Sequence, residues 1–89
     1  MYDLISFVVR GKVRKEVLKS LDRPMTPTIL AEKINNHRST TSRTILELVS
    51  KKLVNCITPK ENMGRYYQIT PLGKKVINKI KEVENGTQK

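Results

Sequence analysis

One segment of this sequence combines side chains suited to anion binding with the spacing of a buried helix face. Residues 37–54 begin with hydroxyl and arginine side chains, gain an apolar stripe, and continue directly into a strand-like segment. Short hydroxyls and arginines in a first helical turn can approach phosphates and base edges, and the helix dipole adds positive potential there. The segment therefore predicts a recognition helix over residues 39–52 with its N-terminal end in a major groove.

At 100° per residue, the two faces of this helix separate clearly. Ile45, Leu48 and Val49 share one face with Thr41, one turn earlier. Arg43 lies on the opposite face, where a bidentate contact to guanine is one interpretation and an ion pair with Glu47 is the other. The residues expected to contact DNA from this helix are Arg38, Ser39, Thr40, Ser42 and Arg43.

Some residues on that outward face keep two interpretations. Ser39 is also a candidate for the N-cap of the helix, a role that is compatible with a phosphate contact. Leu46 points outward and suits either a thymine methyl group or a partner subunit.

Two further segments supply candidate contacts. Thr26 and Thr28 open the preceding helix, where they contact phosphates or only cap the helix. The polar turn over 59–65 contains Lys60, Asn62 and Arg65, which can reach the minor groove or the DNA backbone. A basic turn is also compatible with a simple solvated loop, so the wing contact is a hypothesis.

The charge of the whole chain supports an anionic partner. Lysine and arginine number 18 against 8 aspartates and glutamates, which gives a formal net charge of +10 and a pI near 10.1. General lysine enrichment of the thermophile type usually brings glutamate with it, and here it does not. The excess indicates DNA, RNA or an anionic membrane surface, and we expect double-stranded DNA.

Other functional classes find little support in the composition. With one histidine, one cysteine, no paired carboxylates and no glycine-rich phosphate loop, we expect no enzyme activity and no cofactor. Cys56 and His37 fall short of the ligands that a zinc site needs, so we expect no metal. Without a membrane-length apolar run or a signal-peptide pattern, we expect a cytoplasmic protein with no membrane partner and no evident small-molecule effector.

The order of elements predicts the fold class. Helical spacing marks residues 2–9, 12–21, 27–35, 39–52 and 71–84, and strand patterns mark 53–58 and 65–70. Thr26-Pro27 and Thr70-Pro71 are both cap-plus-proline signals for a helix start. We expect one domain over 1–84, a flexible tail over 85–89, and a mainly α fold with a small β-hairpin (α+β). Its order is α-α-α-β-β-α with an extra N-terminal helical segment, that is, a winged helix-turn-helix.

Three segments, in the expected order, resemble small archaeal winged-helix transcriptional regulators of the MarR/ArsR-like kind. They are Thr26-Pro-Thr-Ile-Leu-Ala-Glu-Lys-Ile, the recognition-helix segment 37–54, and Gly64-Arg-Tyr-Tyr-Gln-Ile-Thr-Pro-Leu-Gly-Lys. The resemblance covers residues 7 to about 80 and implies DNA binding. Two positions depart from the pattern: Thr41 replaces an aliphatic residue, and Lys52 replaces the usual glycine. At Lys52 we therefore expect a less left-handed backbone, or a different helix end.

The terminal helices carry more apolar residues than a minimal three-helix core can bury. We expect them to form a homodimer interface, which would place two recognition helices on one face of a palindromic site. A monomer whose terminal helices pack on each other is the alternative. The function expected is sequence-specific binding by a dimeric transcriptional regulator; alternatives are a protein-interaction module or a nonspecific architectural DNA binder. The residues assigned to the interface are Leu4, Ile5, Val8, Val76, Ile80 and Val83.

Overall fold

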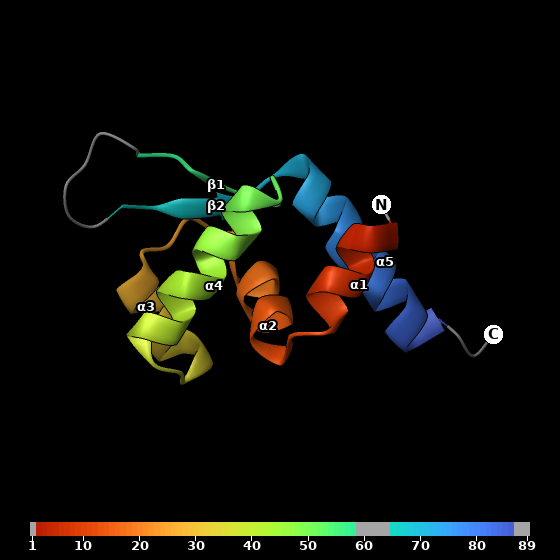
Figure 1. The fold of residues 1–89 in the computed structure, drawn as a ribbon, viewed down its shortest axis with the longest axis horizontal. Helices are drawn as coiled ribbons and strands as arrows, with labels where there is room; N and C mark the ends of the chain where they lie inside the picture. The colour runs from red at the N-terminus through yellow and green to blue at the C-terminus, as the bar shows by residue number, and fades with distance from the viewer. Residues whose placement is uncertain (1, 59–64, 87–89) are drawn as a thin grey trace.

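The computed structural model describes residues 2–58 and 65–86, and it has the element order expected from the sequence (Figure 1). The fold is mainly helical with one two-stranded antiparallel hairpin, which confirms the winged helix-turn-helix class. The elements are α1 (Tyr2–Val9), α2 (Lys12–Ser20), α3 (Pro27–Ile34), α4 (Arg38–Ser50), β1 (Val54–Cys56), β2 (Tyr67–Ile69) and α5 (Pro71–Gly86).

The core lies where α2, α3 and α4 meet, and α5 closes it from the other side. Helix α2 packs on both α4 and α3, and Ala31, which is 5% exposed, allows α3 and α4 to approach closely. The apolar residues with no exposed surface come from all five helices and the start of the hairpin: Val8, Val17, Leu18, Leu21, Leu30, Leu48, Leu53 and Val76. One continuous core therefore fixes the orientation of α4.

The turn between α3 and α4 is set by asparagine. Asn35 adopts a left-handed backbone with φ 57°, and the N–H of Asn36 donates to the carbonyl of Ala31 at 2.9 Å. This six-to-one bond ends α3 sharply, as asparagine in the left-handed region permits. The two asparagines therefore set where α3 ends.

Helix α4 begins and ends one to two residues earlier than expected. Its last turn closes with two bonds, from the N–H of Leu53 to the carbonyl of Leu48 and from the N–H of Lys52 to that of Val49. This is a Schellman motif, and it places Lys52 at φ 67°. The expectation of a less left-handed backbone at Lys52 was wrong, because the buried contact of Leu53 with the core imposes the turn even without glycine.

The hairpin is shorter than the sequence pattern suggested but has a defined register. Val54 pairs with Ile69 and Cys56 with Tyr67, so the strands cover 54–56 and 67–69. Tyr67 also exchanges two backbone hydrogen bonds with Met25, of 3.1 and 2.9 Å, which forms a one-residue bridge on the other edge of β2. The sequence analysis missed this bridge, because a single bridging residue leaves no alternating pattern.

The start of α5 confirms the second cap-plus-proline signal. The hydroxyl of Thr70 accepts a hydrogen bond from the N–H of Gly73 at 3.0 Å, and Pro71 occupies the first helical position. A Cβ at Gly73 would overlap the carbonyl oxygen of Leu53 and come within 2.6 Å of Ile69 Cγ1. Helix α5 continues to Gly86, past the expected end at residue 84, and the remainder of the predicted tail (87–89) lies outside the described residues.

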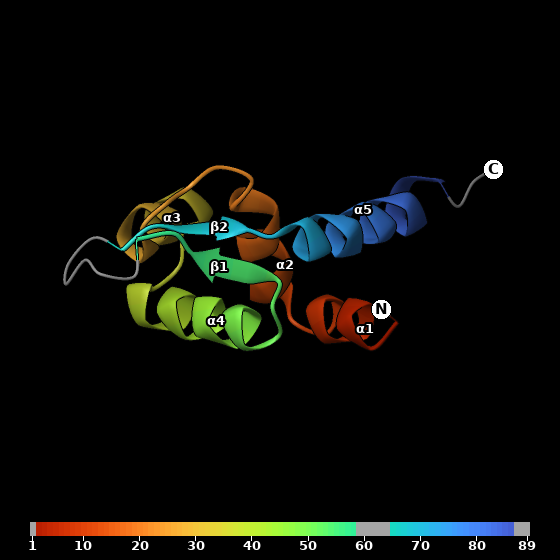
Figure 2. The same ribbon diagram turned by 90° about the horizontal axis from the view of Figure 1, so that it is seen from above.

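The elements separate into two ends in both ribbon views. Helices α1 and α5 lie against each other at one end, and α3, the N-terminal half of α4 and the far ends of the strands lie at the other (Figures 1 and 2). The terminal helices are therefore held away from the predicted DNA-contacting end.

Candidate nucleic-acid interface

The outer side of α4 carries the side chains that the sequence assigned to DNA contact. Arg38, Ser39, Thr40 and Arg43 are all exposed, and Leu46 is 59% exposed on the same side. The inner side buries four residues, namely Thr41, Thr44, Ile45 and Leu48. The predicted buried face is confirmed for Thr41, Ile45 and Leu48, whereas Val49 is only half-buried and Thr44 is buried although the sequence analysis did not assign it to this face.

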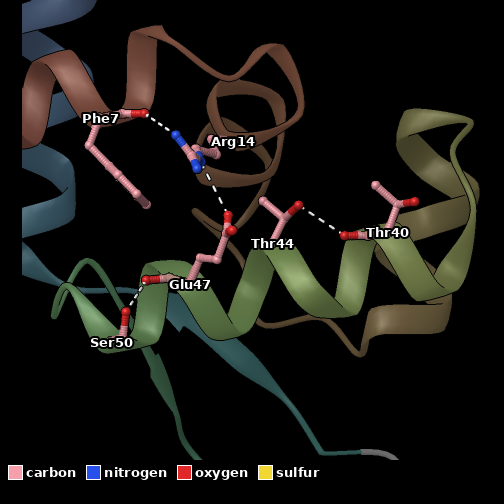
Figure 3. Close-up of polar contacts among 6 residues, drawn as sticks. All are labelled: Phe7, Arg14, Thr40, Thr44, Glu47 and Ser50. Atoms are coloured by element: carbon pink, nitrogen blue, oxygen red, sulfur yellow. Dashed lines mark hydrogen bonds and ion pairs between the residues drawn. The ribbon is translucent and has the colours of Figure 1, made fainter.

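The two buried threonines explain how this helix tolerates polar residues in its core face. The Thr41 hydroxyl donates to the carbonyl of His37 at 2.9 Å. The Thr44 hydroxyl donates to the carbonyl of Thr40 at 2.9 Å (Figure 3). A buried hydroxyl that donates to the preceding turn leaves no unsatisfied group. The departure at Thr41 from the aliphatic pattern therefore leaves the helix in place.

The N-terminus of α4 is capped differently from expectation. His37 is the N-cap and uses no side-chain bond, while Asn36 Oδ1 accepts from the His37 N–H at 2.7 Å. Ser39 lies inside the first turn, so its assignment as the N-cap was wrong. The hydroxyls of Ser39 and Thr40 form no hydrogen bond to any described residue, and both residues are exposed.

Glu47 does not pair with Arg43. Its carboxylate oxygen Oε1 lies 3.1 Å from Nε of Arg14, an arginine of α2, and Figure 3 shows Glu47 directed toward that helix. The side chain of Arg43 forms no hydrogen bond or ion pair with any residue in 2–58 or 65–86. The carboxylate of Glu47 therefore forms no ion pair with the exposed guanidinium of Arg43.

A shallow cleft brings together five of the predicted contact residues from three elements. It is lined by Thr26, Thr28, Arg38, Ser42 and Arg65, together with Pro27 and Tyr67, and has a volume of about 350 Å³. Ser39, Thr40 and Arg43 lie outside its lining, along the exposed side of α4. Pro27 and Tyr67 were not assigned to the site by sequence, since one starts a helix and the other belongs to the core.

The start of α3 forms one wall of this cleft. Thr26 caps the helix through its Oγ1, which accepts from the N–H of Ile29 at 3.2 Å, and Pro27 occupies the first turn. Thr28 is exposed beside it. A helix N-terminus directs N–H groups and a positive dipole outward, so this wall favours an anion.

The wing is described only at its base. Lys60 and Asn62 lie outside the described residues, so their predicted contacts stay predictions. Arg65 is exposed and lines the cleft. Beyond the strands, the Ile57 N–H donates to the carbonyl of Tyr66 at 2.9 Å, and the Tyr66 N–H donates to Thr58 Oγ1 at 2.8 Å. These bonds extend the pairing toward the turn and hold Arg65 beside the cleft.

Three of the residues that the sequence analysis assigned to a dimer interface are buried within the single chain. Val8, Val76 and Ile80 are at most 2% exposed and fill the core of the single chain, so they present no surface to a partner. They turn inward because α1 and α5 pack against each other. Leu4 and Ile5 are half-buried, and Val83 is 63% exposed.

An apolar groove nevertheless remains on the outside of this helix pair. It has a volume of about 550 Å³, and Tyr2 and Val9 at its rim are 87% and 54% exposed. Its lining consists of Tyr2, Ile5, Ser6, Val9, Lys79 and Val83.

Charge pairing at this end of the molecule involves Glu84. The carboxylate accepts a hydrogen bond from Lys15 and lies 3.8 Å from Nζ of Lys19. The hydrogen bond from Lys15, together with the positive charges of both lysines, lowers the pKa of Glu84 below its ordinary value of 4.5. This links the C-terminal part of α5 to α2.

Cys56 and His37, the two residues considered for metal binding, lie in different surroundings. Cys56 is half-buried and packs against the core on the hairpin, whereas His37 is exposed at the start of α4. Within 2–58 and 65–86, no group of three or more histidine, cysteine, aspartate or glutamate side chains is placed to hold a metal ion. Over the same residues, none of the helices has the length and apolar character to cross a membrane.

The helix-turn-helix, the bridge to Met25 and the hairpin define a winged-helix protein. The chain belongs to the family described as the HVO_A0261 N-terminal domain, whose model matches residues 2–88. No curated protein sequence matches the chain.

Several solved structures share the fold. The homodimeric winged helix-turn-helix DNA-binding domain Mb0332 from Mycobacterium bovis, a possible ArsR-family regulator, aligns with a TM-score of 0.78 at 17% identity, over 96% of this chain and 79% of that one. AF1382 from Archaeoglobus fulgidus gives 0.73 at 19% identity, over 89% and 91%. The transcriptional regulator BldR from Sulfolobus solfataricus gives 0.72 at 22% identity, over 85% and 56%.

Not all of these similar proteins match over their full length. The chain covers 51% of RV1404 from Mycobacterium tuberculosis and 62% of the MarR family regulator SP03579. The alignments with these solved structures confirm that the chain shares the fold of MarR- and ArsR-type winged-helix proteins.

Proposed function

We propose that this protein is a non-enzymatic, cytoplasmic transcriptional regulator that binds double-stranded DNA sequence-specifically as a homodimer. The outer side of α4 enters the major groove, and Arg43 contacts a base edge. The cleft receives a backbone phosphate, and the wing, residues 59–65, contacts the adjacent minor groove or backbone.

The cleft is the observation that carries this proposal. Two threonines from the start of α3, Arg38 and Ser42 from α4, and Arg65 beside β2 converge on one shallow, open hollow. Hydroxyls, guanidinium groups and a helix N-terminus are the donors that hold DNA phosphates in register. Such a phosphate contact would leave the exposed Arg43, which follows Ser42 but does not line the cleft, directed into the groove.

The dimer is supported by the apolar groove on α1 and α5. Tyr2, Val9 and Val83 expose apolar surface that a second copy would cover, and their end of the molecule faces away from α3 (Figures 1 and 2). Two copies joined there would present two α4 helices to one face of a duplex, with half-sites about 34 Å apart. Mb0332, which is described as homodimeric, has the same fold.

The proposal is tested by anisotropy measurements of duplex binding against salt, combined with selection and sequencing from a random genomic fragment pool. We expect an enriched inverted repeat and a steep fall in affinity with salt, because several phosphates are neutralised. Salt-dependent binding without an enriched motif would instead indicate an architectural DNA binder. Absence of binding at moderate salt would favour a protein partner, for which Leu46 and Ile29, 59% and 47% exposed, are the apolar candidates.

A further inference from the structure

Arg14 joins three helices at a point that the DNA-contact residues do not touch. Arg14 lies in α2, and its Nη1 donates to the carbonyl of Phe7 in the last turn of α1 at 2.9 Å. Its Nε donates to Oε1 of Glu47 in α4 at 3.1 Å (Figure 3). The guanidinium also lies 3.9 Å from the centre of the Phe7 ring. One planar group therefore makes three directed contacts to two other helices.

Each of these contacts suits arginine in particular. The Phe7 carbonyl belongs to the last turn of α1, where unsatisfied carbonyls and the negative dipole end attract a cation. A guanidinium can donate from two nitrogens in fixed directions and stack on a ring at the same time, which an ammonium group cannot do. Lys51, just after α4, adds a second cation 5.2 Å from the same ring.

The contact with Glu47 bears directly on the recognition helix. Glu47 is one turn after Arg43, and within α4 it is the only acidic residue. The side chains of Arg14 and Glu47 are 26% and 40% exposed, so their pairing is partly shielded from water. The buried residues of α4 set its orientation, and the tie from Glu47 to Arg14 is a further restraint on its rotation one turn after Arg43.

From these contacts we infer that Arg14 is a positioning residue for DNA recognition, which acts through Glu47 and Phe7 to hold α4 against α1 and α2. This inference rests on the proposed DNA-binding function. It assigns to Arg14 a role in discrimination between sequences, separate from its positive charge. Removing the tie should leave electrostatic binding in place and weaken the choice of bases.

Two variants separate positioning from charge. Arg14→Met removes one positive charge and all three directed contacts, whereas Glu47→Gln removes a negative charge and so favours binding to any DNA. Arg10→Met is the matched control, because Arg10 is exposed and forms no side-chain contact with described residues. The double variant Arg14→Met with Glu47→Gln tests whether the two residues act together.

The measured quantity is the ratio of affinities for the selected site and for a scrambled duplex at fixed salt, with thermal unfolding of each variant as a check on folding. We expect Arg14→Met and Glu47→Gln each to lower this ratio by about threefold or more, the scale of a partly exposed charge pair. The double variant should be no worse than the more affected single variant. Arg10→Met should weaken both affinities equally and leave the ratio unchanged.

The outcomes distinguish this inference from the function on which it rests. If the wild-type chain discriminates between the duplexes and the folded Arg14→Met protein keeps the same ratio, the positioning role is overturned and the proposed function stands. Additive losses in the double variant would also overturn the coupling. If the wild-type chain shows no sequence preference, the proposed function fails, and the positioning role fails with it.

Discussion

The hydroxyl of Thr70 donates a 2.8 Å hydrogen bond to the carbonyl of Lys52. It thereby connects Lys52, in the turn that closes α4, to the N-cap of α5. Lys52 itself has φ 67°, a left-handed conformation that costs a residue with a Cβ about 1–2 kcal/mol. The junction between α4, the hairpin and α5 thus combines a side-chain hydrogen bond with a backbone angle that is unfavourable for lysine.

We predict that Lys52→Gly stabilises the protein. Glycine adopts the left-handed region without steric cost, and part of that gain is lost to its greater freedom in the unfolded chain, which leaves about 0.5–1 kcal/mol. Urea unfolding measures the change. Lys52→Ala is the control, because it removes the same charge and keeps the Cβ. Equal stabilities of the two variants would show that charge, rather than backbone strain, sets the effect.

Gly73→Ala should destabilise the chain by about 1–3 kcal/mol, although alanine is the better helix former. The added Cβ would overlap the backbone carbonyl of Leu53, which cannot move without disturbing the entry to β1. Thermal unfolding provides the comparison with Asn78→Ala, an exposed position of the same helix. We expect the control to change stability by less than about 0.5 kcal/mol. A Gly73→Ala protein as stable as wild type would contradict the close approach.

Arg43→Ala should lower discrimination between the selected and mismatched DNA sites by about 1–3 kcal/mol while leaving the folded state intact. The physical reason is loss of a bidentate base contact from an exposed guanidinium that no described residue engages. Competition binding at constant salt measures it, with Arg10→Ala as the variant of equal charge. If both variants reduce specific and nonspecific affinity alike, Arg43 contacts phosphate only.

Val83→Glu should weaken self-association at least about tenfold. A carboxylate placed in the apolar groove with Tyr2 and Val9 would have to be desolvated, and Lys79, the cation in the groove lining, already lies 3.7 Å from Glu82. Sedimentation equilibrium of the variant is compared with that of Asn78→Glu, which makes the same charge change elsewhere on α5. Dimers of unchanged affinity in Val83→Glu would place the interface outside this groove.

The pairing of Glu84 with Lys15 and Lys19 predicts a pH dependence of stability. Because the folded-state pKa of Glu84 lies below its ordinary value of 4.5, the carboxylate contributes stability at pH values above 4.5. That contribution disappears as the pH falls through the lowered folded-state pKa. The difference in unfolding free energy between wild type and Glu84→Gln should therefore shrink on acidification below 4.5. A difference that is constant with pH would rule out the ionised pair.

The sequence by itself determined the order of the elements and the side of α4 that faces outward. Thr26-Pro27 and Thr70-Pro71 marked two helix starts because the first turn of a helix has backbone N–H groups without partners. The threonine hydroxyl accepts a hydrogen bond from one of them, and proline has no N–H that needs a partner. The periodicity of Ile45 and Leu48 placed Arg43 on the exposed side. These features depend on neighbours within a few residues, so the chain encodes them locally.

Contacts between distant residues were decided only by the tertiary structure. An ion pair of Glu47 with Arg43, four residues earlier, was one of the two interpretations that the sequence allowed, but the partner of Glu47 is Arg14, 33 residues away. Val8, Val76 and Ile80 resembled an interface by their spacing, and they fill the core because α1 and α5 pack on each other. Lys52 adopts a glycine-like angle because burial of Leu53 imposes the turn. Periodicity shows that a side chain is apolar or outward, but the packing of whole elements selects its partner.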